Sequence, residues 1–401
     1  MTRRRAVLAG TLGATTLGVL GRAVPATAAA PRPGPLVLVG GGLSDDNAAI
    51  YQTIVDLAGG DRARIGVLTA ASVPPSQDPD AGTPDASNSA ANGAYYSDLL
   101  RSYGAGQVTW IPVDLDTIAN ADDPALATQI DTMTGFFFGG GDQYRYVTCL
   151  LHGDAHTDSL VMAAIRRRHQ AGAVVAGSSA GAEIQQGTDM VTGGESYNAL
   201  RDGCQPGYFD DPDVSGYLPA GGFGLLSSGL IDTHFSAYGR LGRALQLART
   251  TLHRRVYGLD PDTALLVHSP GTAYETGRVV GVNGVSILDL RNTTARWSYL
   301  TDGAAYHPHA WRAVLPRQLK ILRPVRGLPV PSSDDVFADW AATDLARQLA
   351  SCTAPTAVGY TRQTDPQFEV ALSKLPGFCA YTDDSINAAS FVDLAVTIRR
   401  R

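Results

Sequence analysis

The sequence predicts an α/β protein with a doubly wound, mostly parallel sheet and a small C-terminal α+β extension. From Pro35 onward, short apolar runs alternate with stretches of helical spacing, as expected of successive strand–helix units. The apolar runs contain no alternating polar residues, which is typical of parallel strands covered by helices on both faces. The chain has 401 residues, of which 44% are hydrophobic and 17% are charged, so it can fill a large core.

The first half of the chain repeats this strand–helix pattern. The apolar run at 36–39 enters a glycine turn at 40–42, which lacks the G-x-G-x-x-G spacing of a dinucleotide site. A loop rich in Pro, Asp, Ser and Asn is predicted at 72–92. The remaining predicted elements here are strands at 65–68, 108–113, 136–138 and 173–176, and helices at 48–57, 95–103 and 160–169.

The second half is predicted to be partly antiparallel near its end. Further strand candidates occupy 229–235, 256–259, 264–267 and 279–290. The α/β domain is expected to span residues 31–315, followed by a proline-rich linker at 316–333 and a small unit at 334–401. In that unit an apolar stripe from Val336 to Leu349 predicts a helix, and alternation over 392–398 predicts a strand.

Residues 1–30 read as a signal peptide and not as part of the fold. Three arginines at 3–5 precede a short apolar run, and residues 26–28 (ATA) offer a cleavage site. The start resembles a twin-arginine signal, so we expect a secreted protein that no membrane retains after cleavage. Removing these residues, which include four arginines and no acid, changes the formal charge from −6 to −10. An acidic mature protein argues against nucleic acid as a partner.

The cysteine pattern predicts oxidised thiols and no zinc site. All four cysteines lie in the exported part, and Cys352 and Cys379 are the favoured disulfide pair because they share the C-terminal region. The connectivity remains open. No C-x-x-C or Cys/His spacing indicates zinc, and we expect no metal.

The most informative motif is GSSAG at residues 177–181, directly after the predicted strand at 173–176. G-x-S-x-G after a buried strand is typical of a nucleophile elbow, in which a serine occupies a strained strand-to-helix turn. Ser179 is then the nucleophile, and the N–H of Ala180 can face a developing oxyanion. The alternative is a tight glycine turn with a spectator serine, because a chain with 44 glycines produces such patterns by chance.

A histidine and two arginines follow the next predicted strand. Of eight histidines, His234 is best placed to act as a base, because it ends an apolar strand downstream of the serine. Arg240 and Arg243 stand three residues apart on one face of an opening helix, where guanidinium groups suit a substrate carboxylate. A structural histidine and a solvated helix start are the alternatives.

These motifs together resemble the cyanophycinase branch of the dipeptidase E family of serine peptidases. The resemblance covers about residues 35–300 and rests on GGDQ at 140–143, GSSAGA at 177–182 and DTHF at 232–235 with the two arginines. It implies a flavodoxin-like, class-I-glutamine-amidotransferase-like fold and no organic cofactor. It also implies an oxyanion hole at the N–H groups of Gly141 and Ala180, with Gln143, Asp232 and the arginines binding substrate.

Three positions depart from the family pattern. Thr233 replaces a glutamine, Tyr238 replaces an arginine, and Pro261 replaces the glutamate that would orient the base. A proline cannot orient an imidazole, so a neighbouring carboxylate must do so. We favour Asp260 because it ends a predicted strand, with Asp262 and Glu195 as alternatives.

The resemblance implies an exported serine exopeptidase that cuts a polyaspartate bearing arginine side chains into β-aspartyl dipeptides. One alternative is a dipeptidase E-like enzyme for Asp-X dipeptides. Another, of a different class, is a non-catalytic secreted binding protein with a degraded triad. The expected partner is a peptide or polyaspartate-type substrate, and a homodimer is one candidate assembly.

Overall fold

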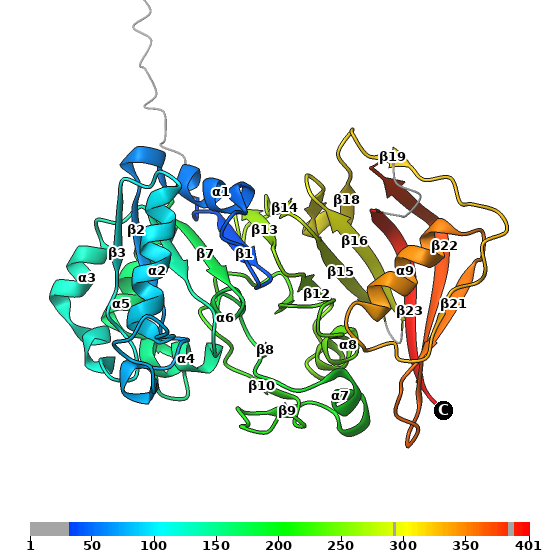
Figure 1. Cartoon of the computed structure of the whole chain (residues 1–401), viewed down its shortest axis with the longest axis horizontal. Coiled ribbons are helices and arrows are strands. Elements are labelled where there is room, and N and C mark those ends of the chain that lie inside the picture. Colours follow the sequence, from blue (N-terminus) through cyan, green and yellow to red (C-terminus); the bar gives the residue numbers. More distant parts are fainter. Residues whose placement is uncertain (1–31, 292–293, 384–388) are drawn as a thin grey trace, which may run out of the picture. The chain divides into compact units, whose positions relative to one another are not determined.

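A doubly wound sheet forms the first half of the protein, as predicted. In the computed structural model, which describes residues 32–291, 294–383 and 389–401, strands β1, β7, β4, β2 and β3 pair in parallel (Figure 1). Counted from β2, the order β3-β2-β4-β7-β1 is the 2-1-3-4-5 order of a flavodoxin-like sheet. The chain's first strand, β1, takes the position of the fifth strand in that order. Antiparallel strands β13, β14, β17 and β18 extend the sheet beyond β1. The strands of this sheet are β1 (Leu36–Val39), β2 (Arg64–Leu68), β3 (Gln107–Trp110), β4 (Gly135–Phe138), β7 (Val174–Ser178), β13 (Thr263–His268), β14 (Thr276–Gly281), β17 (Ala305–His307) and β18 (Arg312–Val314).

Helices cover both faces of this sheet. Alternate residues of β1 belong to different cores: Leu36 and Leu38 pack with helices α3, α4 and α5, whereas Val37 and Val39 pack with α1 and α2. This two-sided burial explains why the strands are apolar throughout. The helices are α1 (Ala48–Ala58), α2 (Ser89–Ser102), α3 (Pro124–Ile130), α4 (Gln143–Leu150), α5 (Leu160–Gln170), α6 (Ala180–Glu183), α7 (Ser196–Asp202), α8 (Leu241–Thr250) and α9 (Ala341–Ser351), with 3-10 turns η1 (Gly60–Arg62), η2 (Pro75–Gln77), η3 (Ile118–Asp122) and η4 (Pro308–Ala310).

A second large sheet joins the middle of the chain to its C-terminus. Strands β22 and β23 pair with each other, and β23 pairs with β16, so residues 334–401 complete a sheet that begins at β11. The prediction that residues 334–401 form a separate unit is therefore wrong, and residues 32–401 form one compact unit. The strands are β11 (Leu230–Asp232), β12 (Arg255–Leu259), β15 (Gly284–Arg291), β16 (Thr294–Thr301), β19 (Lys320–Ile321), β20 (Ser332–Ser333), β21 (Thr356–Tyr360), β22 (Phe368–Thr382) and β23 (Ser390–Arg400).

The strand predicted at 279–290 is divided between the two sheets. It is the end of β14 and most of β15, separated by a turn in which Gly281 has φ +125°. A Cβ at Gly281 would lie 2.5 Å from the Asp262 carbonyl oxygen, so the turn requires glycine. The chain crosses here from the doubly wound sheet to the second sheet.

Two small sheets complete the described fold. One consists of β8 (Met190–Val191), β9 (Gln205–Pro206) and β10 (Gly216–Leu218), and the other of β5 (Leu151–His152) and β6 (Thr157–Asp158). Within the described residues, no helix is long and apolar enough to span a membrane. The predicted signal peptide, residues 1–30, lies outside the described residues.

All four cysteines are free in the structure, so the predicted disulfide between Cys352 and Cys379 is not formed. Cys352 is buried at the end of α9, where its thiol donates to the Leu349 carbonyl oxygen at 3.5 Å. Cys379 lies on β22 opposite Val392. An even cysteine count in a shared region constrains neither the separation nor the direction of two thiols, which the fold decides.

Candidate active site

Ser179 occupies a nucleophile elbow between β7 and α6. Its backbone has φ +54° and ψ −120°, a strained conformation for a residue with a side chain. The flanking glycines make the turn possible: a Cβ at Gly177 would lie 2.0 Å from the Gly181 carbonyl oxygen, and one at Gly181 would lie 2.0 Å from that of Phe138. Close backbone approach therefore requires glycine at 177 and 181, and the hydrogen bond of the Ser179 hydroxyl with His234 argues against the spectator-serine alternative.

His234 meets the nucleophile from the end of β11, the edge strand of the second sheet. Its Nε2 lies 2.9 Å from the Ser179 Oγ, a hydrogen-bond distance. The residue follows β11 with φ +47°, and its N–H donates to the Gly40 carbonyl oxygen at 2.7 Å. Gly41 leaves room for the ring, because a Cβ there would lie 2.1 Å from Nε2. Two segments far apart in sequence thus form a serine–histidine pair.

The environment keeps the His234 imidazole neutral. Burial is the main cause and the Arg240 guanidinium the second, and together they lower the pKa of His234 from 6.5 to about 4. A neutral imidazole at physiological pH can accept the seryl proton. The pair is therefore in the protonation state that nucleophilic attack requires.

An aromatic ring is stacked on the face of the imidazole. The Tyr238 ring is stacked on His234, with centroids 4.9 Å apart and planes inclined by 8°. The Arg240 guanidinium lies 5.0 Å from the Tyr238 ring centroid. Among the described residues, no carboxylate is hydrogen-bonded to His234 Nδ1. Stacking fixes the plane of the ring, but it supplies no negative charge to an imidazolium.

Asp260, predicted to orient the histidine, has other partners. Its two carboxylate oxygens accept hydrogen bonds from the Ser236 N–H and the Tyr299 hydroxyl, each at 2.8 Å. Burial raises the pKa of Asp260 to about 6. The carboxylate therefore ties the loop after His234 to β16. The prediction is corrected because a strand end fixes where a residue lies and leaves open which way its side chain turns.

The alternative acids are also not placed against the base. Asp262 accepts hydrogen bonds from the N–H and hydroxyl of Ser44 and from the Asn47 amide, and so fastens the loop after β1. Glu195 is exposed at the start of α7. The described site is accordingly a serine–histidine dyad without an orienting carboxylate.

Two backbone N–H groups are available as an oxyanion hole. The N–H groups of Gly141 and Ala180 donate to no described protein group. Gly140 approaches the nucleophile closely, since a Cβ there would lie 3.4 Å from Ser179 Cβ. Gly141 itself has φ +137°, and a Cβ there would lie 2.2 Å from the Ala71 carbonyl oxygen. Free donors beside a seryl oxygen suit the charge of a tetrahedral intermediate.

The predicted substrate-binding residues divide into buried and accessible groups. Arg243 is buried and holds Asp232 through two contacts, Nε–Oδ2 at 3.0 Å and Nη2–Oδ1 at 2.6 Å. This ion pair therefore holds the first turn of α8 in place. Arg243 was predicted to bind a substrate carboxylate, and this prediction is wrong because Asp232 already occupies its guanidinium. Arg240 donates to the Thr233 carbonyl oxygen at 2.6 Å, and its side chain remains 18% exposed. Gln143 is buried and donates to the Val191 carbonyl oxygen at 2.8 Å, which holds β8 near the oxyanion hole.

Glu183 is a site residue that sequence reasoning missed. Its Oε1 accepts hydrogen bonds from the N–H and hydroxyl of Thr233, at 3.1 and 2.8 Å, and lies 3.8 Å from Arg240. Thr233 is the departure from the family's glutamine, and the contact gives it a role in anchoring the residue before His234. Glu183 stands four residues after Ser179, one helical turn on, and this spacing was the available signal.

The site has the geometry of a serine hydrolase, with Ser179 at the carboxyl end of β7 in the doubly wound sheet and His234 at the carboxyl end of β11 in the second sheet. Among the described residues, no cluster of three or more His, Cys, Asp or Glu side chains is arranged to hold a metal ion. The candidate nucleophile, base and oxyanion donors all lie within residues 141–234, so a family relationship that concerns this site should include this span.

Comparison with known proteins finds sequence similarity over a span that includes these residues. Residues 83–273 match the sequence profile of peptidase family S51. The chain is 29% identical over 262 residues to cyanophycinases of Synechococcus elongatus and Thermosynechococcus vestitus, a span covering 65% of this chain and 69% of each relative. Over 261 residues it is 28% identical to a cyanophycinase of Trichormus variabilis, covering 64% of this chain and 74% of that one.

Solved structures of peptidases also match the chain. A peptidase from an acI-B1 actinobacterium has 19% identity and a TM-score of 0.47, with coverage of 69% of this chain and 98% of that one. A putative peptidase E from Listeria monocytogenes has 12% identity and a TM-score of 0.35, with coverage of 65% and 100%. The protein is a serine-type peptidase, and its resemblance to cyanophycinase-like enzymes is confirmed by the sequence comparisons. The non-catalytic alternative is therefore not supported.

Proposed function

We propose that the protein is an exported serine exopeptidase for Asp-containing peptides or isopeptides, which releases β-Asp-Arg dipeptides from cyanophycin. The observation that carries the catalytic part is the 2.9 Å contact between Ser179 Oγ and a neutral His234. The similarity to proteins named cyanophycinase supports the choice of substrate.

The geometry suits acyl transfer through a covalent intermediate. Ser179 Oγ attacks the scissile carbonyl carbon while His234 Nε2 takes the seryl proton. The N–H groups of Gly141 and Ala180 stabilise the oxyanion, and the intermediate collapses as His234 returns the proton to the leaving amine. Water, deprotonated by the same imidazole, then hydrolyses the acyl-serine ester and regenerates the enzyme.

Arg240 is the group proposed to bind a substrate carboxylate. It is the accessible member of the arginine pair, and it lies beside the histidine through Tyr238. A guanidinium in this position suits the α-carboxylate of a terminal aspartyl unit. Asp232 engages Arg243 at 2.6 Å, whereas Arg240 lies 3.5 Å from Asp232 and 3.8 Å from Glu183. Arg240 has the longer ion pairs, so it is the one guanidinium of the pair that we propose for substrate. A single guanidinium also favours the second candidate, a dipeptidase E-like enzyme for Asp-X dipeptides.

Product analysis separates the two candidates. The protein is incubated with cyanophycin and, separately, with Asp-X dipeptides, and products are identified by mass spectrometry with Ser179→Ala as control. β-Asp-Arg released from the polymer supports the first proposal, and turnover of Asp-X dipeptides alone supports the second. If a fluorophosphonate labels Ser179 but neither substrate is cut, the proposed substrate class is wrong.

Export is proposed from the N-terminal residues. The arginines at 3–5, the apolar run and the ATA site predict a mature chain that begins near Ala29 or Ala30. N-terminal sequencing of protein recovered from the culture medium tests this. Secreted protein that retains Met1 would contradict cleavage.

A further inference from the structure

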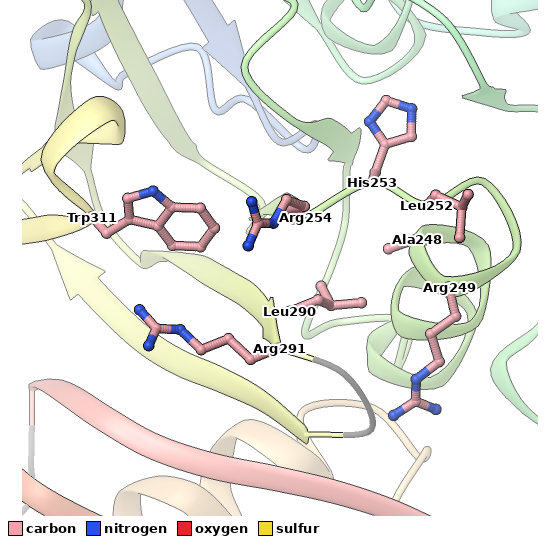
Figure 2. A pocket seen from close by; sticks show the side chains of 8 residues that line it. All are labelled: Ala248, Arg249, Leu252, His253, Arg254, Leu290, Arg291 and Trp311. Atoms are coloured by element: carbon pink, nitrogen blue, oxygen red, sulfur yellow. The ribbon is translucent and has the colours of Figure 1, made fainter.

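A cationic pocket lies away from the catalytic dyad. It is an open cavity of about 780 Å³ between the end of α8, the start of β12 and the end of β15. Figure 2 shows Arg254 and Trp311 pointing toward one another across it, with Arg291 on β15 below them and Arg249 on α8. The residues that line it are Ala248, Arg249, Leu252, His253, Arg254, Leu290, Arg291 and Trp311.

Guanidinium groups converge on the Trp311 ring. The Cζ atoms of Arg254 and Arg291 lie 5.6 and 5.8 Å from its centroid, and that of Arg255 lies 4.3 Å from it. Contacts of this length are cation–π interactions, and a shared indole holds the cations close despite their mutual repulsion. An arrangement of this kind favours a ligand that brings negative charge.

The carboxylates near the pocket are already engaged. Asp289 accepts from Arg255 at 2.8 Å, and Asp189 accepts from His253 at 2.9 Å. Among the described residues, no carboxylate lies within ion-pair distance of Arg254 or Arg291, and both side chains are exposed. These cations are uncompensated in a chain whose formal charge is −6. Solvent and mobile ions alone screen them in the free protein.

The pocket and the dyad lie at opposite ends of β12. β11 and β12 are parallel, and Phe235, next to His234, donates to the Leu259 carbonyl oxygen at the carboxyl end of β12. Arg254 precedes the amino end of this strand of five residues. At a rise of about 3.3 Å per residue, the separation along the strand is about 16 Å. A dipeptide at Ser179 cannot reach the pocket, whereas a longer chain can.

From this geometry we propose that the pocket is an exosite for a carboxylate-bearing peptide chain, which the enzyme holds while its end is cut at Ser179. The proposal rests on the proposed function for the identity of the chain as substrate. Arg254 and Arg291 pair with successive carboxylates, and the Trp311 ring keeps the two guanidiniums together. The exosite adds affinity for polymers by tethering, and it leaves the chemistry of the dyad unchanged.

Direct binding tests the exosite independently of catalysis. Ser179→Ala protein is titrated with fluorescein-labelled poly-L-aspartate, and the affinity is compared with that of Ser179→Ala proteins that also carry Arg254→Gln with Arg291→Gln, or Arg326→Gln. Arg326 is exposed and does not line the pocket, so it controls for general charge. We expect the double change to weaken binding about tenfold and the control to change it less than twofold, and we expect added salt to weaken binding by the Ser179→Ala parent.

Kinetics of otherwise wild-type protein give a second readout. The double change in the pocket should raise KM for a polymeric substrate and leave kcat/KM for an Asp-X dipeptide unchanged. Poly-L-aspartate that fails to bind, or that binds equally well to the double variant and the control, overturns the exosite. Poly-L-aspartate that binds through the arginines while no peptide is cut leaves the pocket established and contradicts the proposed function instead.

Discussion

Gly41→Ala should inactivate the enzyme while leaving it folded. Gly41 follows β1 with φ +89°, and a Cβ there would lie 2.1 Å from His234 Nε2 and 2.2 Å from its Cε1. Non-bonded heavy atoms need about 3.5 Å, so the ring must retreat by more than about 1 Å. The retreat breaks the 2.9 Å contact with Ser179, because Nε2 is both the atom displaced and the atom that accepts the proton.

The expected loss follows from this displacement. A misplacement of about 1 Å in a catalytic group costs on the order of 10²-fold, and complete loss of a member of a nucleophile–base unit costs on the order of 10⁴-fold. We therefore expect kcat/KM to fall between these limits. The left-handed backbone adds a stability penalty of about 1–2 kcal/mol, which should lower the melting temperature by a few degrees.

Gly82→Ala is the matched control. Gly82 has φ +83°, and a Cβ there would meet no heavy atom within 4 Å, so the control shares the backbone penalty without the clash. Both variants are compared with wild type for kcat/KM on an Asp-X dipeptide, for the rate of fluorophosphonate labelling and for melting temperature. If Gly41→Ala retains activity within about threefold of Gly82→Ala, the position of the histidine ring described above is refuted.

Three further predictions concern the dyad and its surroundings. Ser179→Ala and His234→Ala should each lower kcat by on the order of 10⁴-fold with an unchanged melting temperature, and wild-type hydrolysis by either would contradict its role. Asp260→Asn should lower kcat/KM less than about tenfold, because this carboxylate does not contact His234, whereas an orienting acid would cost on the order of 10⁴-fold. As pH falls, kcat/KM should decline with a midpoint near 4, because burial lowers the pKa of His234 to about that value and the protonated imidazole cannot act as a base. A midpoint near 6.5 would show that the imidazole is solvated and would contradict this prediction.

The sequence alone determined the features that depend on neighbouring residues. The elbow could be predicted because its strain, its glycines and its serine lie within residues 177–181, and close backbone approach leaves few other sequences possible. The parallel sheet could be predicted for a similar reason, since burial on both faces leaves a continuous apolar run in each strand. His234 was found from its place after such a run.

The tertiary structure decided which polar groups are paired. Arg240 and Arg243 look equivalent in sequence, but the fold buries Arg243 in a 2.6 Å contact with Asp232, whereas Arg240 lies 3.5 Å from the same carboxylate and stays partly exposed. Asp260 ends a strand as expected, yet its carboxylate bonds to Ser236 and Tyr299. Such partners come from segments far apart in the chain, and a local pattern holds no information on them.

Long-range pairing likewise decided the fate of the C-terminal residues. A helix stripe and a strand after a proline-rich stretch look like a separate unit, because each is recognised by its own periodicity. In the fold, Trp297 of β16 packs edge-on against Phe391 of β23, with ring centroids 5.4 Å apart, and the two strands share hydrogen bonds. Periodicity in the sequence indicates which face of a helix or strand is buried. Which other element packs against that face depends on contacts between distant segments, and these form only in the folded chain.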